Sequence, residues 1–136
     1  KKEIVLPDTQ TQTQTVVVYF GEESQDCSAV VGVERVIEVT PAIGYATLTT
    51  LLQGPLAHEE AQGLFTSIPE GVVVQRLAIE DGIASVDFND ALDDGVAGSC
   101  RVIHIRSQIT KTLLQFPTVS DVVISINGET ETILQP

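Results

Sequence analysis

The segment SCRVIHIRSQITKTLLQF, residues 99–116, decides the fold of this chain because it has the clearest periodicity. Its apolar side chains recur at gaps of 3, 4, 4 and 3 positions, and they are Val102, Ile105, Ile109, Leu113 and Phe116. This spacing places all of them on one face of an α-helix. Ser99 is a residue type that caps helix N-termini, and Pro117 cannot continue a helix. We therefore predict an amphipathic helix here that covers a sheet.

Short β-rich segments lie on both sides of this helix. They are residues 15–20, 35–39, 72–79, 83–88, 122–126 and 129–134. Asp81-Gly82 and Asn127-Gly128 each separate two of these segments, and both pairs are typical of two-residue hairpin turns. We therefore expect one hairpin over 72–88 and a second over 122–134.

A second helix is predicted over residues 41–55, where three leucines have helical spacing before Gly54 and Pro55 stop the helix. Residues 56–71 are expected to add a helical turn. Together the elements predict an α+β fold, a two-layer sandwich. Its sheet would be mostly antiparallel or mixed, with about five to six strands and two to three helices on one face.

Composition and charge limit the function classes. The 136 residues include 19 acidic and 7 basic side chains, for a net charge of −12. The basic residues form no cluster along the sequence, so binding to nucleic acid or to an anionic membrane surface is excluded. No apolar run approaches the roughly 20 residues needed to span a bilayer.

The start of the chain differs from the rest. Residues 1–14 end in an alternating Thr/Gln tract that has little to bury, and they predict a linker or the end of a preceding segment. Residues 15–136 then form the domain. Because the chain does not begin with Met, we expect an anchor or another domain upstream.

Cys27 and Cys100 are the only cysteines, and their separation matches no zinc signature. In an exported protein they would form a disulfide, whereas in the cytosol they would be two inert buried thiols. Cys100 and His104 also lie four positions apart, which suits a nucleophile and its base on one helix face. No orienting Asn or Asp and no oxyanion loop accompanies them. We therefore predict no catalytic residue.

The stretch ASVDFNDALDDGVAGSCR, residues 84–101, carries five acidic or amide side chains, Asp87, Asn89, Asp90, Asp93 and Asp94. A calcium loop needs oxygen ligands at alternate positions, and alanine or leucine falls on required ones. A glycosidase pair needs one carboxyl group in an apolar setting, whereas the adjacent Asp93 and Asp94 should be solvated. The simplest interpretation is acidic residues gathered ahead of a helix N-terminus, which carries partial positive charge. We predict no metal and no cofactor.

The order of the motifs resembles the GerMN domain of sporulation and spore-germination proteins. The matching segments are TVVVYF (15–20), ATLTTLLQGP (46–55), GLFTSIPEGVVVQRLAIEDGIASVDF (63–88), GSCR (98–101) and QITKTLLQFPTVSDVVISINGE (108–129). The resemblance covers about residues 15–134. The two cysteines are a departure, because they are not part of the family pattern.

This resemblance implies a non-enzymatic module of the cell envelope, similar in fold to the ring-building modules of secretion-type complexes. Family members are extracytoplasmic, and many are lipoproteins tethered to the membrane through an upstream segment. In spore formers the family supports a multiprotein assembly between two membranes. The implied partners are envelope proteins or further copies of the chain, and the family has no established catalytic residues.

Two candidate contact surfaces follow from physical arguments. Exposed sheet edges can pair with strands of a neighbour. An acidic surface at Asp90, Asp93 and Asp94 could select a basic partner. Two alternatives to an interaction module stay open at this point: a domain that binds envelope polysaccharide or a small ligand, and a thiol-dependent or carboxylate hydrolase.

Overall fold

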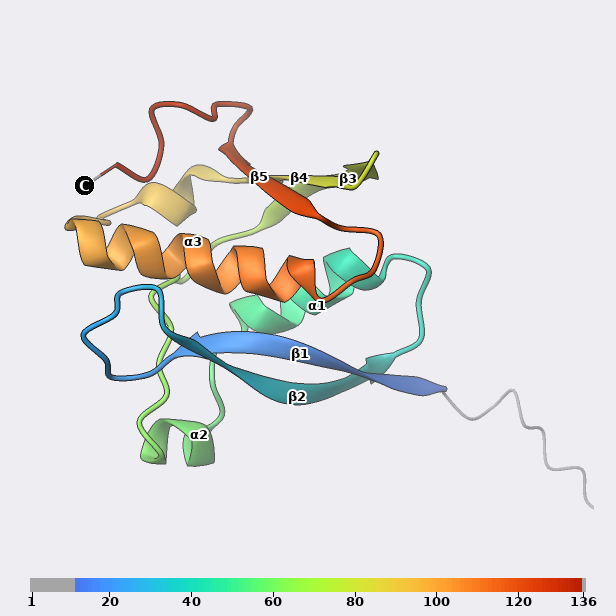
Figure 1. Cartoon of the computed structure of the whole chain (residues 1–136), viewed down its shortest axis with the longest axis horizontal. Coiled ribbons are helices and arrows are strands. Elements are labelled where there is room, and N and C mark those ends of the chain that lie inside the picture. The colour runs from blue at the N-terminus through green and yellow to red at the C-terminus, as the bar shows by residue number, and fades with distance from the viewer. Residues whose placement is uncertain (1–11, 136) are drawn as a thin grey trace, which may run out of the picture.

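The computed structural model describes residues 12–135, and its N-terminal part is a long β-hairpin (Figure 1). Strand β1 (Thr13–Gly21) pairs antiparallel with β2 (Val30–Glu38) without a register shift. Alternation in β1 buries Val16, Val18 and Phe20, as expected for a strand with one face on a core. The hairpin thus turns one face inward and leaves the other in solvent.

The second sheet has three strands in the order β3-β4-β5. Strand β3 (Val74–Glu80) pairs antiparallel with β4 (Ile83–Phe88) through a turn in which Asp81 and Gly82 have φ of 53° and 81°. These left-handed values confirm the predicted two-residue hairpin turn. Strand β5 (Asp121–Ile126) pairs parallel with β4, so the chain crosses from one to the other through a long connection.

That connection contains the 3₁₀ turn η2 (Asp90–Asp93) and the longest helix, α3 (Ser99–Leu114). Two shorter helices, α1 (Ile43–Leu52) and α2 (Ala57–Ala61), follow the first hairpin. Helix α3 contacts both β1 and β5, and α1 contacts both β1 and β3. Figure 1 shows α1 and α3 between the hairpin and the three-stranded sheet, and α2 apart from this core beside the hairpin.

The core lies on both sides of α3. Its helical stripe is buried as predicted at Val102, Ile105, Ile109 and Leu113. No helix of the described residues is both long and apolar enough to cross a membrane. The α+β class, the five strands, the mixed pairing and the three helices agree with the prediction, but the strands form two sheets rather than one. Helices α1 and α3 therefore pack between the two sheets instead of covering a single face.

Residues 129–134 do not form the predicted sixth strand. Asn127 and Gly128 turn with positive φ as expected, but pairing stops at a single bridge between Ile126 and Glu129. The chain then returns over the end of the core, where Ile133 and Leu134 are buried. Ile133 and Leu134 are thus buried against the core and not in a strand paired with β5. The apolar pattern of this segment was therefore misread as a strand.

Two predicted boundaries also change. Helix α3 is preceded by Gly98 at the cap position, so Ser99 is its first helical residue and not its cap. At the N-terminal end β1 already begins at Thr13. Residues 1–11 of the predicted linker lie outside the described residues. The described chain starts and finishes at opposite ends of the long axis, along which β1 runs (Figure 1).

Candidate functional site

Of the two alternatives for Cys27 and Cys100, a disulfide or two buried thiols, the structure shows the disulfide, and the bond ties the β1–β2 loop to the start of α3. The sulfur atoms of Cys27 and Cys100 are 2.07 Å apart, and the two Cα atoms are 5.1 Å apart. Because both thiols are consumed, neither can act as a nucleophile or a metal ligand. The thiol-dependent chemistry considered from the spacing of Cys100 and His104 is therefore absent from this form of the protein.

His104 lies beside the disulfide and is fixed at both ring nitrogens. Its Nε2 is 3.0 Å from the carbonyl oxygen of Ala29, which can only accept a hydrogen bond. In the neutral ring Nε2 therefore carries the hydrogen, and Nδ1 accepts from the Ser67 hydroxyl at 3.0 Å. A Cβ atom at Gly21 would overlap the ring, so glycine is needed where β1 passes His104. The His104 side chain thus joins three segments of the chain.

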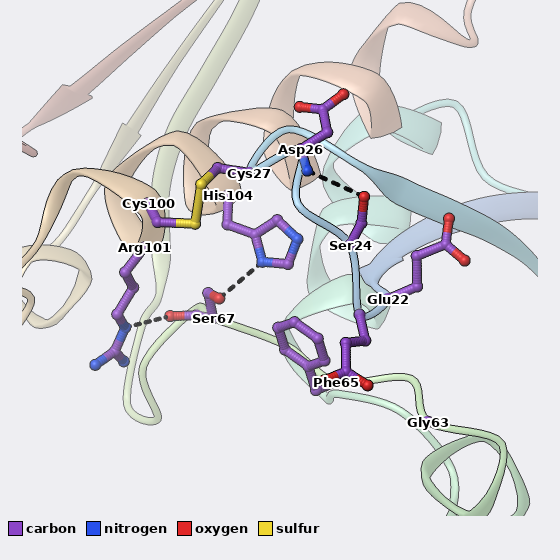
Figure 2. A pocket seen from close by; sticks show the side chains of 11 residues that line it. Glu22, Ser24, Asp26, Cys27, Gly63, Phe65, Ser67, Cys100, Arg101 and His104 are labelled. Carbon is purple, nitrogen blue, oxygen red and sulfur yellow. Dashed lines mark hydrogen bonds between the residues drawn. A yellow bond between two sulfur atoms is a disulfide. The ribbon is translucent and has the colours of Figure 1, made fainter.

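A pocket of about 590 Å³ opens in front of this histidine (Figure 2). Its walls come from residues 22–27, 63–67 and the first turns of α3. Glu22 and the Phe65 ring stand on one side, and Arg101, which donates to the Ser67 carbonyl at 3.1 Å, stands on the other. Phe65 is 41% exposed, which leaves its ring available to a ligand. The pocket therefore offers acidic, cationic and aromatic groups to a small molecule or to a side chain of another protein.

The acidic stretch does not converge on one point. Asp93 accepts from the backbone N–H of Leu134 at 3.2 Å, while Asp90 and Asp94 are exposed. No acidic residue lies in the first turn of α3 itself, and Asp94, the last aspartate before it, lies five positions ahead of Ser99. Within residues 12–135 no three His, Cys, Asp or Glu side chains are placed to hold a metal ion.

Asp87 and Asn89 instead act in local structure at the end of β4. Asp87 accepts from the Ser125 hydroxyl at 2.6 Å, from the Gly128 N–H at 2.7 Å and from the Gln75 amide at 2.8 Å. Burial is the largest single influence and raises the pKa of Asp87, but these donors together outweigh it, so its pKa lies below the ordinary value. Asn89 bonds the backbone of the loop before β3. Asp87 and Asn89 therefore have a structural role.

Two glutamines, Gln108 in α3 and Gln115 at its C-terminal cap, hold the hairpin, and the sequence analysis missed both. Gln115 accepts from the Val17 N–H at 3.0 Å and donates to the Val17 carbonyl at 2.6 Å. Gln108, which is fully buried, donates to the Tyr19 carbonyl at 3.0 Å and accepts from the Ser67 N–H at 2.9 Å. The side-chain amides thus take the place of a neighbouring strand along the inner edge of β1. Their seven-residue spacing, next to the apolar stripe, was the available signal.

The outer strand of the hairpin has one ionic anchor. Arg35 of β2 binds both carboxylate oxygens of Glu59 in α2, each at 2.6 Å. Hydrogen bonding from the Arg35 guanidinium lowers the pKa of Glu59 to about 2. The short helix α2 is therefore fastened to the hairpin by a two-point ion pair.

Comparison with solved structures confirms the fold. The chain is similar to the tandem GerMN domains of the sporulation protein GerM from Bacillus subtilis, with a TM-score of 0.71 and 24% identity over 95% of this chain and 43% of that one. It is also similar to the first GerMN domain of that protein, with a TM-score of 0.67, 21% identity and coverage of 87% and 86%. A Clostridium perfringens protein described as a candidate lipoprotein matches with a TM-score of 0.59 and 17% identity, over 90% and 80%.

Sequence comparison gives the family. The chain is 28% identical over 127 residues to the spore germination protein GerM of Bacillus subtilis, which covers 90% of this chain but only 34% of that protein. The profile of the Germane family, described as "Sporulation and spore germination", matches residues 17–132. This match takes in most of the chain, and the chain belongs to the Germane (GerMN) family of sporulation and spore-germination domains.

Proposed function

We propose that this domain is a non-enzymatic interaction module of the cell envelope that assists the assembly of a multiprotein complex outside the cytoplasm. The Cys27–Cys100 disulfide is the observation that carries the proposal. Disulfides of this kind persist in exported proteins and are rare in the cytosol. The bond also removes the two thiols on which the hydrolase alternative depended. A lipoprotein anchor and a role in sporulation or germination are supported by the relatives, and they belong to this proposal.

Crosslinking in cells of the source organism tests the proposal. A photoreactive amino acid is placed at Val36 on the hairpin, at Ser85 on the outer face of the three-stranded sheet, or at Phe65 in the pocket. We expect discrete adducts with envelope proteins from at least one of these positions, and trapping with an alkylating reagent should find Cys27 and Cys100 oxidised. Reduced cysteines in a cytoplasmic protein that gives no adduct at any position would contradict it.

The pocket beside His104 favours a second candidate function, binding of an envelope glycan or another small ligand. Its volume of about 590 Å³ is in the range of ligand sites, and Phe65 provides an aromatic surface. Titration with soluble peptidoglycan fragments, followed by NMR, should then shift the amide signals of residues 63–67 and 100–104. Shifts confined to other parts of the domain would remove this candidate.

A further inference from the structure

The hairpin has two long backbone edges, one on β1 and one on β2, and only the β1 edge has most of its N–H and carbonyl groups hydrogen-bonded. On β1, the backbone groups of Val17, Tyr19 and Gly21 point away from β2. The first two meet the glutamine amides of α3, and Gly21 exchanges two hydrogen bonds with Phe65, at 2.7 and 3.0 Å. The inner edge is therefore satisfied along most of its length.

The register then determines which groups of β2 are free. Val17 lies opposite Glu34, and Tyr19 lies opposite Gly32. In an antiparallel pair of strands, two residues that lie opposite each other either hydrogen-bond to each other or both point their N–H and carbonyl groups away from the partner strand. Gly32, Glu34 and Val36 therefore present N–H and carbonyl groups at the outer edge of β2. Within residues 12–135 the hydrogen bond that reaches this row is one from the Arg35 side chain to the Glu34 carbonyl, at 3.2 Å.

This outer edge lacks most of the features that protect sheet edges. Natural edge strands are kept from pairing by proline, by bulges, by short length or by a covering element. Strand β2 is nine residues long, contains no proline and pairs with β1 without a bulge. Its solvent face carries Glu34, Val36 and Glu38, and Val36 is 68% exposed. The protection present is negative charge.

The negative charge on the solvent face of β2 indicates which kind of strand can pair with it. Two copies of β2 paired edge to edge would bring their glutamates together, and like charges on neighbouring strands are destabilising. The net charge of −12 adds repulsion between copies of the chain. A strand with lysine, an apolar residue and lysine at alternate positions would instead match the glutamate–valine–glutamate row of β2.

We propose that β2 is extended by one further strand, supplied by a segment of another protein that carries basic residues on both sides of an apolar one at alternate positions. Backbone hydrogen bonds to Gly32, Glu34 and Val36 give the affinity, and Glu34 and Glu38 give the charge selectivity. This inference rests on the proposed function as an interaction module and names its docking edge and the chemistry of its partner.

A synthetic peptide tests the edge directly. The probe is capped Thr-Lys-Thr-Val-Thr-Lys-Thr, added to the 136-residue chain and followed by amide exchange and NMR. We expect protection of the Glu34 and Val36 amides. With the peptide antiparallel to β2 and its valine opposite Val36, N-methylation of the valine and one lysine removes donors that face β2 and should weaken binding at least about tenfold, since each lost hydrogen bond costs about 1 kcal/mol. N-methylation of two threonines between them, which point outward, should leave binding unchanged.

Charge reversal tests the selectivity. The variant Glu34→Lys/Glu38→Lys should bind the basic peptide at least about tenfold more weakly and gain binding to Thr-Glu-Thr-Val-Thr-Glu-Thr. Glu70→Lys/Glu80→Lys makes the same change in net charge at exposed sites on another part of the domain, and it should bind as the unmodified protein does. Equal effects of the two double variants would show general charge attraction and overturn the proposal.

Further results test strand addition and separate this inference from the proposed function. Equal binding of the two N-methylated peptides, or protection of the β2 amides by self-association without peptide, would overturn strand addition. If cells give crosslinks from Ser85 or Phe65 but the basic peptide does not protect the β2 amides, strand addition at β2 is contradicted while the proposed function as an interaction module stands. If the peptide protects the β2 amides but no position gives a crosslink in cells, strand addition at β2 stands while the proposed function as an interaction module is contradicted.

Discussion

Backbone pairing builds the three-stranded sheet, whereas the two-stranded hairpin is fixed to the rest of the molecule mainly by side chains. In the former, β4 is paired along its length with β3 on one side and with β5 on the other. In the latter, β1 pairs with β2 on one side, has a single bridge from Gly21 to Phe65 on the other, and otherwise depends on Gln108, Gln115, the disulfide and the Arg35–Glu59 pair. An isolated two-stranded ribbon is at best marginally stable in water. A few polar contacts therefore decide where half of the sheet structure lies.

The largest expected effect comes from removing the Gln108 amide. Gln108→Ala should destabilise the domain by about 4 kcal/mol, because it leaves the Tyr19 carbonyl and the Ser67 N–H unsatisfied and opens a cavity. Urea unfolding measures the loss, and amide exchange should rise more in β1 than in β4. Gln62→Ala, which removes an exposed amide at the end of α2, is the control and should cost less than about 1 kcal/mol. Similar losses for the two variants would mean that the amide does not hold the hairpin.

Removal of the disulfide should have the next largest effect. Cys27→Ala/Cys100→Ala should lose about 3 kcal/mol, since the bond closes a loop between residues 73 positions apart. Amide exchange should increase in residues 22–29 and in the first turn of α3, with little change in β3, β4 and β5. Dithiothreitol should bring the unmodified protein to the stability of the variant and leave the variant unaffected. Uniform acceleration across both sheets would show that the bond supports the whole domain and not the hairpin alone.

The ion pair below the hairpin should have the smallest effect and a characteristic pH dependence. Glu59→Gln should cost about 1–2 kcal/mol at pH 7, because the pair is largely buried but the glutamine oxygen can still accept one of the two hydrogen bonds from Arg35. Folding lowers the pKa of Glu59 from 4.5 to about 2, so its contribution is present in full above pH 4.5 and is lost as the pH falls toward 2. Unfolding curves of both proteins should therefore converge over this range.

Glu60→Gln provides the matched control for this pH dependence. Glu60 is the exposed neighbour of Glu59 in α2. Its variant should differ from the unmodified protein by less than about 0.5 kcal/mol at every pH. A constant difference between Glu59→Gln and the unmodified protein down to pH 2 would contradict the assignment of the pair.

The parts of the fold that were predictable have a local cause. The stripe of α3 follows from helical spacing, and the Asp81-Gly82 turn follows from the need for positive φ at two successive residues. The family resemblance rested on the same segments and is confirmed by the profile match over residues 17–132. Local signals of this kind need no knowledge of what packs against them.

The features that were predicted wrongly or missed depend on residues that are far away in the sequence. The 129–134 segment alternates like a strand, yet Ile133 and Leu134 are buried at the end of the core instead of pairing. The role of Gln108 was missed because the strand that needs its amide lies 89 positions away in the sequence. The parallel pairing of β4 with β5 and the division of the strands between two sheets likewise depend on contacts between distant segments. Neither propensity nor periodicity contains this information.

The direction of β1 has a mechanical consequence. Because this strand runs along the long axis and the described chain leaves at the opposite end, a tether pulling on the two ends would slide β1 lengthwise against β2 and α3 (Figure 1). The hydrogen bonds along the strand would then be strained together instead of opening one after another. The disulfide after β1 would pass part of that tension straight to α3. The geometry suits a domain that stays folded while its attachments move.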